Sequence, residues 1–263
     1  MLIPLSPGAG RAGRGAALAA RWALAGGVGA ACSAHAQSAL VDRLQGDVGA
    51  AFYDTRSVVR GASADRVLLP YAYADDGRFY ARVDTLGFKT WALGAGHLEL
   101  SARVSLEGYA SNGALPGIRS RSDPAPLGLG TFQRTPYGAV FAYAFRDLTS
   151  GGSLLEATYA AALALGPLQL YPAVGVERRS ARYVDHLYGV SPAEAAASGR
   201  PAYAPGASTW PVASLTAQWP VLSDWSVVAQ LRRKWFDHAV TDSPLVDAHA
   251  QDSGFVALAY HFK

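Results

Sequence analysis

Apolar and polar residues alternate along many short segments of this chain. The clearest alternation covers residues 97–109, where one face holds Leu98, Leu100, Ala102, Val104 and Leu106 and the other holds Glu99, Ser101, Arg103, Ser105 and Glu107. A period of two residues places the two sets on opposite faces of a β-strand. The segment is longer than the roughly nine to eleven residues that a tilted strand needs to cross a bilayer. The pattern therefore predicts a strand with one face toward lipid and a charged face toward a barrel interior.

The last residues of the chain show the same alternation. One face holds Val256, Leu258, Tyr260 and Phe262, and the other holds Phe255, Ala257, Ala259 and His261. A soluble edge strand can carry this pattern too. The segment nevertheless resembles the closing, assembly strand of bacterial outer-membrane barrels, although Lys263 follows the terminal aromatic residue. In a barrel we expect Tyr260 and Phe262 to lie in the interfacial aromatic girdle.

The first 36 residues have the pattern of a cleaved signal peptide. They combine a basic start, a short apolar run and an Ala34-His35-Ala36 cleavage motif, with the basic charges supplied by Arg11, Arg14 and Arg21. The apolar run is too short for a membrane helix. Lipidation at Cys32 is an alternative, but Gly29-Ala30-Ala31 lacks the bulky aliphatic residue that usually precedes a lipidated cysteine. We therefore expect residues 1–36 to direct export and residues 37–263 to form an outer-membrane β-barrel.

The segments between turns predict an all-β, transmembrane, antiparallel up-and-down barrel of about ten strands with both termini in the periplasm. Connections on the periplasmic side are then short (75–77, 166–167, 220–224), and those outside are long (184–208, 239–253). Residues 111–130 are rich in Gly, Pro and Ser and break this rule, since they form a long loop on the periplasmic side. Either a pair of strands is missed, which gives twelve, or the protein has an unusual periplasmic element.

Charge and cysteine content change once the signal peptide is removed. The formal charge of +3 comes from 23 basic and 20 acidic residues, and three of the arginines and no acid lie in residues 1–36. The mature chain is thus neutral, which gives no indication of nucleic-acid binding. The single Cys also leaves. A cysteine-free chain excludes a disulfide framework, thiol catalysis and Cys-ligated zinc.

Catalytic and metal-binding patterns are absent from the sequence. The histidines have no spacing typical of a metal site, and no HExxH motif occurs. Asp185, His186 and Ser191 lie close in sequence and suggest a hydrolase, but no G-x-S-x-G motif accompanies them. We therefore expect a non-enzymatic protein with no catalytic residue, no cofactor and no metal.

Charged residues on the expected strands predict an interior network. The candidates are Arg103, Arg178, Arg232, Glu99 and Glu107. Buried charges must pair or meet water, so these residues form either a plug of ion pairs or a selectivity ring in a narrow pore. A barrel of about ten strands is mostly filled by its own side chains, which favours the plug.

The long loop at residues 184–208 contains the start of a short helix. Ser191 suits the N-cap, Pro192 the first helical position, and Glu194 the third position of a capping box. Gly199 is a suitable C-terminal stop. On its own this pattern predicts a shaped surface loop.

The same loop resembles the signature of the MipA/OmpV family of Gram-negative outer-membrane proteins, which includes the MltA-interacting protein. The matching positions are Tyr188, Gly189, Val190, Ser191, Glu194, Ser198, Gly199, Pro201 and Tyr203. Arg200 departs from the Leu that is more usual there, while residues 243–246 and 260–262 also resemble the family.

The resemblance implies an outer-membrane barrel that contacts lipid and does not bind nucleic acid. It also implies a scaffold for murein-remodelling enzymes, namely a periplasmic lytic transglycosylase and a penicillin-binding protein. The loop lengths make residues 111–130, if they are periplasmic, the candidate docking element. Other members are porin-like or adhesive, so a narrow channel or a surface adhesin is the alternative.

Overall fold

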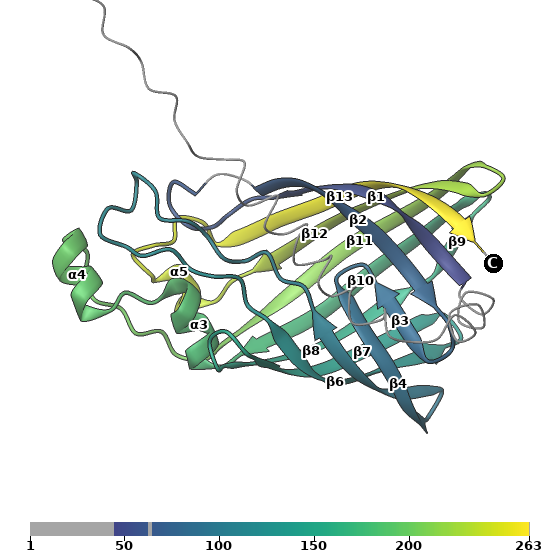
Figure 1. Ribbon diagram of the computed structural model, residues 1–263, viewed down its shortest axis with the longest axis horizontal. Coiled ribbons are helices and arrows are strands. Elements are labelled where there is room, and N and C mark those ends of the chain that lie inside the picture. Colours follow the sequence, from purple (N-terminus) through teal and green to yellow (C-terminus); the bar gives the residue numbers. More distant parts are fainter. Residues whose placement is uncertain (1–44, 63–64, 263) are drawn as a thin grey trace, which may run out of the picture. The chain divides into compact units, whose positions relative to one another are not determined.

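The computed structural model describes residues 45–62 and 65–262, which form an antiparallel β-barrel with short helices at one end (Figure 1). The strands are β1 (Gln45–Thr55), β2 (Asp65–Asp75), β3 (Phe79–Arg82), β4 (Thr85–Leu93), β5 (Gly96–Arg103), β6 (Pro126–Thr135), β7 (Gly138–Asp147), β8 (Ser153–Ala161), β9 (Leu163–Leu165), β10 (Leu168–Arg179), β11 (Ser208–Leu222), β12 (Trp225–Trp235) and β13 (Ala250–Phe262). The helices are α3 (Ala181–Tyr188), α4 (Pro192–Ser198) and α5 (His238–Thr241). None of these helices is long and apolar enough to span a membrane. The expected signal peptide and Lys263 lie outside the described residues.

The sheet closes on itself because β1 pairs with β13 and β10 pairs with β11. The strands number thirteen among the described residues, but β8 and β9 both pair with β10 and follow each other along it. They therefore fill one place in the ring, which has twelve places. The expectation of about ten strands is wrong, and the alternative of twelve is correct.

The sequence pattern misses two strands, because it merges β3 with β4 and assigns the start of β6 to a loop. Residues 78–88 have the pattern of one strand, yet they turn tightly between β3 and β4. Val83 in that turn has φ 57°, a conformation that β-branched residues rarely adopt and that no Gly or Asn announces. In β6, Gly128 and Gly130 look like loop residues. A Cβ on Gly130 would lie 1.8 Å from the Tyr143 ring, so glycine is needed there to accommodate the aromatic side chain.

The two ends of the barrel carry different connections. One end, which we call the turn end, has only short connections. Gly46 of β1 pairs with Phe262 of β13 at this end, so the described chain both enters and leaves the barrel there. The opposite end, which we call the loop end, carries the helices and the long segments 104–125, 180–207 and 236–249 (Figure 1). Residues 111–125 thus lie at the same end as residues 184–207, and residues 126–130 of the expected loop belong to β6. The apparent exception to the loop rule came from the missed strands.

Side chains alternate between the interior and the outer surface as expected. In β13, Phe255, Ala257 and Ala259 are buried, while Val256, Leu258 and Tyr260 are exposed. The outer surface carries many large apolar residues, which suits contact with lipid. Exposed aromatic residues gather near the turn end, namely Trp91, Tyr137, Trp219, Trp225 and Tyr260. They correspond to an interfacial aromatic girdle.

Candidate functional site: loop cap and interior network

The long segments at the loop end pack into a compact structure, which we call the loop cap (residues 56–62, 104–125, 180–207 and 236–249). Its core is apolar and includes Val58, Val59, Tyr109, Leu115, Ile118, Tyr183, Val184, Leu187, Tyr188, Val190, Val240, Leu245 and Val246. The segments also approach closely at the backbone: a Cβ on Gly117 would lie 2.6 Å from the Ala197 carbonyl carbon. The cap is therefore packed like a small soluble domain.

The helix expected in the signature loop is confirmed. Ser191 is the N-cap of α4, and its side chain accepts a hydrogen bond from the Glu194 amide while the Glu194 carboxylate accepts one from the Ser191 amide. Pro192 begins the helix, and Gly199 ends it in the left-handed conformation with φ 70°. The sequence therefore defines this helix locally.

Glu194 has a second role that its sequence position does not reveal. Its carboxylate pairs with the Arg121 guanidinium at 2.8 and 3.2 Å, and Arg121 also donates to the Gly189 carbonyl at 2.9 Å. Both side chains are buried, at 2% and 8% exposed. Burial acts to raise the pKa of Glu194, but the hydrogen bonds from Arg121 and Ser191 outweigh it and lower this pKa to about 2. The pair joins the signature loop to residues 104–125.

The remaining signature residues hold the cap together. Val190 and Tyr203 exchange backbone hydrogen bonds of 2.8 and 2.9 Å. The Tyr188 carbonyl accepts the Ser243 hydroxyl at 2.6 Å, and the Tyr203 hydroxyl donates to the Ala239 carbonyl at 3.3 Å. Ser198 and Pro201 lie at the cap surface, where Pro201 is exposed. The signature thus describes a structural cap.

Inside the barrel, the first ion pair joins β3 to β5. Arg82 donates two hydrogen bonds to the Glu99 carboxylate at 2.7 and 2.8 Å, and the Tyr143 hydroxyl donates to Glu99 at 2.9 Å. The Arg82 guanidinium also lies over the Tyr80 ring, 3.9 Å from its centroid. Glu99, a predicted interior residue, is therefore fully engaged.

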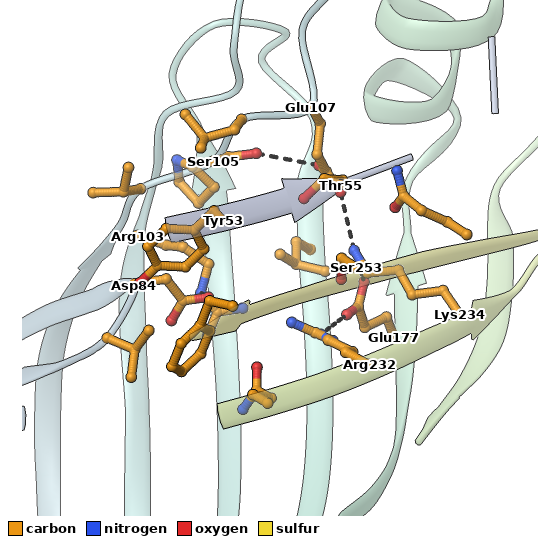
Figure 2. Close-up of a pocket in the computed structure, with 18 of the residues that line it drawn as sticks. Tyr53, Thr55, Asp84, Arg103, Ser105, Glu107, Glu177, Arg232, Lys234 and Ser253 are labelled. Carbon is orange, nitrogen blue, oxygen red and sulfur yellow. Dashed lines mark hydrogen bonds and ion pairs between the residues drawn. The ribbon is translucent and has the colours of Figure 1, made fainter. Parts of the chain in front are cut away.

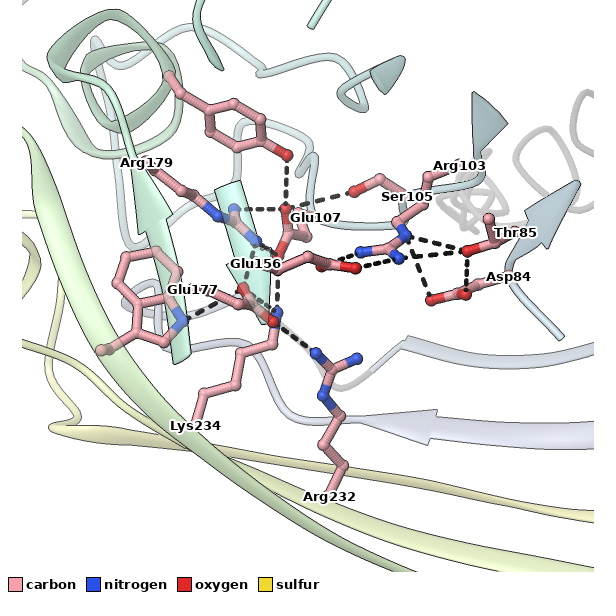
Figure 3. A network of polar contacts seen from close by, with 12 residues as sticks. Asp84, Thr85, Arg103, Ser105, Glu107, Glu156, Glu177, Arg179, Arg232 and Lys234 are labelled. Carbon is pink, nitrogen blue, oxygen red and sulfur yellow. Dashed lines mark hydrogen bonds and ion pairs between the residues drawn. The ribbon is translucent and has the colours of Figure 1, made fainter. Parts of the chain in front are cut away.

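A second group surrounds Arg103 (Figure 3). Arg103 pairs with both carboxylate oxygens of Glu156 and lies 3.8 Å from Asp84. Its Nε and Nη2 donate to the Thr85 hydroxyl at 3.2 Å. Glu156 lies directly opposite Glu177 on β10. Two carboxylates in register repel each other, so each needs its own cation.

A third group supplies the cations for Glu177 and Glu107 (Figure 3). Arg179 donates to the two Glu107 oxygens at 2.6 and 2.7 Å and to Glu177 at 3.1 Å. Lys234 bridges the same two acids at 3.1 and 3.6 Å. Arg232 pairs with Glu177, which also accepts the Trp210 indole N–H at 3.2 Å. We call these three groups together the interior network.

The structure places four of the five predicted charges in this network, and one elsewhere. Glu99, Arg103, Glu107 and Arg232 all form interior ion pairs. Arg178 was expected inside but is exposed on the outer face, where it donates to the Thr209 hydroxyl at 3.2 Å. The interior arginine of β10 is Arg179. The parity of β10 could have shown this, since Arg179 is two residues from the inward Glu177.

The interior network borders two cavities of about 170 and 220 Å³. Five residues line both: Val83, Asp84, Arg103, Gln230 and Arg232. Figure 2 shows Arg103, Asp84 and Tyr53 on one side of the first cavity and Arg232, Lys234 and Glu177 on the other. Within the described residues, no group of three or more His, Cys, Asp or Glu side chains is arranged to hold a metal ion.

Comparison with known proteins identifies the family of this chain. The family described as MltA-interacting protein MipA matches residues 48–262. The protein YiaT of Escherichia coli (strain K12), named provisionally as an outer membrane protein, is 27% identical over 231 residues, which is 86% of this chain and 93% of that protein. The MltA-interacting protein of the same strain is 40% identical over 82 residues, or 31% of this chain and 33% of the relative.

Among solved structures, the alignment with OmpT of Vibrio cholerae covers 83% of this chain and 96% of that protein, with 9% identity and a TM-score of 0.27. The family match extends over nearly the whole barrel, from β1 to β13. The chain thus belongs to the MltA-interacting protein MipA family and is an outer-membrane β-barrel protein.

Proposed function

We propose that this protein is a non-enzymatic scaffold that binds a lytic transglycosylase and a penicillin-binding protein at the outer membrane. The interior network carries this proposal, because its charges are equal in number and satisfy one another. Its basic residues are Arg82, Arg103, Arg179, Arg232 and Lys234, and its acidic residues are Asp84, Glu99, Glu107, Glu156 and Glu177. A neutral interior crosslinked by ion pairs favours a plug over an open pore. A plugged barrel does not conduct solutes, so we place its function in binding other proteins at its surface.

The turn end is the surface that we propose for the partner. Bacterial barrels place short turns in the periplasm and long loops outside. Applied to this barrel, that rule puts the turn end and both termini on the murein side of the membrane. Residues 111–130 belong to the opposite end and are not part of this proposed surface. The name and the partial similarity of the E. coli MltA-interacting protein support a partner of the lytic transglycosylase class.

Three glycines offer matched sites to test which end binds. Gly77 and Gly166 lie in turns at the turn end and Gly206 in the loop cap, and a Cβ at each would meet no atom within 4 Å. Short Gly-Ser insertions after Gly77 or Gly166 should abolish capture of a purified lytic transglycosylase by the detergent-solubilised protein. The same insertion after Gly206 should leave capture unchanged. Capture that survives both turn insertions, or that is lost only with the cap insertion, contradicts the proposal.

A narrow channel is the second candidate, since both cavities reach Arg232, which is 29% exposed and pairs with Glu177 alone. If the network gates a pore, Arg232→Gln should raise conductance in planar bilayers. Arg178→Gln is the matched control, because it removes an arginine from the outer face. We expect both variants and the wild type to show no conductance. An increase in conductance with Arg232→Gln alone favours the channel.

A further inference from the structure

Outward-facing arginines near the loop end fall into two groups. On the side formed by β12, β13, β1 and β2, the two outward-facing strand arginines each pair with an aspartate on the neighbouring strand. Arg233 pairs with Asp252 at 2.7 and 2.8 Å, and Arg66 with Asp54 at 3.2 Å. These cross-strand pairs leave little net charge on that side.

On the far side of the ring, Arg146 of β7 and Arg178 of β10 have no such partner. Both are exposed, and they are separated only by β8, where Ser153 lies opposite Arg146 and Leu155 opposite Arg178. Within residues 45–62 and 65–262 neither arginine forms an ion pair, and Arg178 makes only its hydrogen bond to Thr209. The same barrel thus has a neutral side and a cationic side at one level.

The cationic side borders the apolar outer surface. Leu127 of β6 lies opposite Arg146, and Leu155 and Val176 are exposed beside and below Arg178. Arginines at such a border place their charged heads in the headgroup layer while their stems cover apolar surface. If the loop end faces outward, as the proposed orientation has it, this layer is the outer leaflet.

We propose that Arg146 and Arg178 form a binding site for the phosphate groups of an outer-leaflet lipid. A guanidinium group can donate two parallel hydrogen bonds to phosphate oxygens. Two guanidinium groups separated by one strand can hold one phosphorylated headgroup. Within the described residues neither guanidinium group is held in an ion pair, so both are available to a phosphate group. The site depends on the orientation of the barrel and not on capture of an enzyme, so it can stand if the scaffold proposal fails.

Thermal unfolding in a neutral detergent tests this site, with bisphosphorylated lipid A as the probe. The wild-type midpoint should rise with added lipid A. The Arg146→Gln/Arg178→Gln variant should need roughly 30-fold more lipid for the same rise, as expected for two basic residues near an anionic headgroup. The control is Arg66→Gln/Asp54→Asn, which removes one arginine and its neutralising acid, and it should behave as the wild type. Midpoints without lipid show that each variant is folded.

Three results overturn the proposal. One is a wild-type midpoint that does not respond to lipid A. Another is an equal response of the double variant and the wild type. The third is a rise produced by inorganic phosphate at the same concentration, which would show a site for free anions.

Discussion

The loop cap and the barrel interior bury side chains in opposite ways. The cap core is apolar, with Leu115, Leu187 and Leu245 fully buried, and the buried ion pair between Arg121 and Glu194 joins two of its segments. The barrel interior is crossed by ion pairs, whereas strand leucines such as Leu100 and Leu129 are exposed on the outer surface.

The difference follows from the solvent on each side. Along a barrel strand, alternate residues face lipid, so apolar side chains gain by pointing outward and polar ones are left inside. The cap lies beyond this apolar surface, where the hydrophobic effect drives apolar side chains inward. We therefore expect the cap to respond to substitution like a soluble domain. We expect the barrel interior to tolerate the loss of one charge, because Glu107 and Glu177 each pair with more than one cation.

The largest effect should come from Glu194→Ala. It leaves the Arg121 guanidinium buried without its partner, and breaking a buried pair in this way costs about 4 kcal/mol. Hydrogen exchange of amides in residues 104–125 and 181–207 should accelerate accordingly, while the barrel strands stay protected. The control is Arg119→Ala, whose exposed side chain lies 3.6 Å from Glu194 and should cost less than about 1 kcal/mol. Equal effects of the two variants would show that the buried pair does not hold the cap.

Leu187→Ala should be next in size. Leu187 is 0% exposed in the cap core, so its truncation leaves a cavity and costs about 3 kcal/mol. Leu100→Ala on the outer face of β5 is the matched substitution in the barrel and leaves no cavity. It loses only the transfer of apolar groups from water to lipid, so we expect it to cost about 1.5 kcal/mol by denaturant unfolding in lipid vesicles. Similar costs would contradict the contrast between cap and outer surface.

Acid should loosen the cap through Glu194. Its folded pKa of about 2 lies below the ordinary value of 4.5, so the stabilisation is complete above pH 4.5 and is lost as the pH falls toward 2. At pH 3 the loss is about 2 kcal/mol. Near-ultraviolet circular dichroism of the buried cap tyrosines should report it, and Glu194→Gln should remove the pH dependence in this window. A Glu194→Gln protein with an unchanged acid transition would assign the effect to another group.

The smallest effect concerns the interior network. Arg232→Gln should cost about 1 kcal/mol in denaturant unfolding, because Glu177 keeps Arg179 and Lys234 as partners. Arg178→Gln should change stability by less than about 0.5 kcal/mol, since its hydrogen bond to Thr209 is exposed. A larger loss with Arg178→Gln than with Arg232→Gln would contradict the assignment of Arg232 to the interior.

Local patterns predicted much of this architecture. The alternation in residues 97–109 and 255–262 identified β5 and β13 with the correct faces, although β5 ends at Arg103 and residues 104–109 belong to the loop cap. Ser191, Pro192, Glu194 and Gly199 identified α4. In each case the signal lies within a few neighbouring residues. The barrel class also followed from the sequence, because the two-residue period recurs in many segments.

The failures arose where tertiary contacts decide. The β3–β4 turn has Val83, not Gly or Asn, at its left-handed position, and Gly130 of β6 makes room for Tyr143. Arg178 and Arg179 lie on opposite faces of β10, so an error of one residue in the expected alternation reverses which arginine is placed inside the barrel. The contact of Arg121 with Glu194 joins residues 73 apart, and no local pattern announces it.

The orientation of the two ends is the central claim, and tag accessibility on intact cells tests it most directly. Epitope tags in residues 111–130 and 184–208 should both be reached by external antibody or protease. A tag at Gly77 or Gly166 should be protected until the outer membrane is opened. If the turn-end tags are exposed and the cap tags protected, the barrel is inserted the other way, and both the proposed partner surface and the lipid site are wrong.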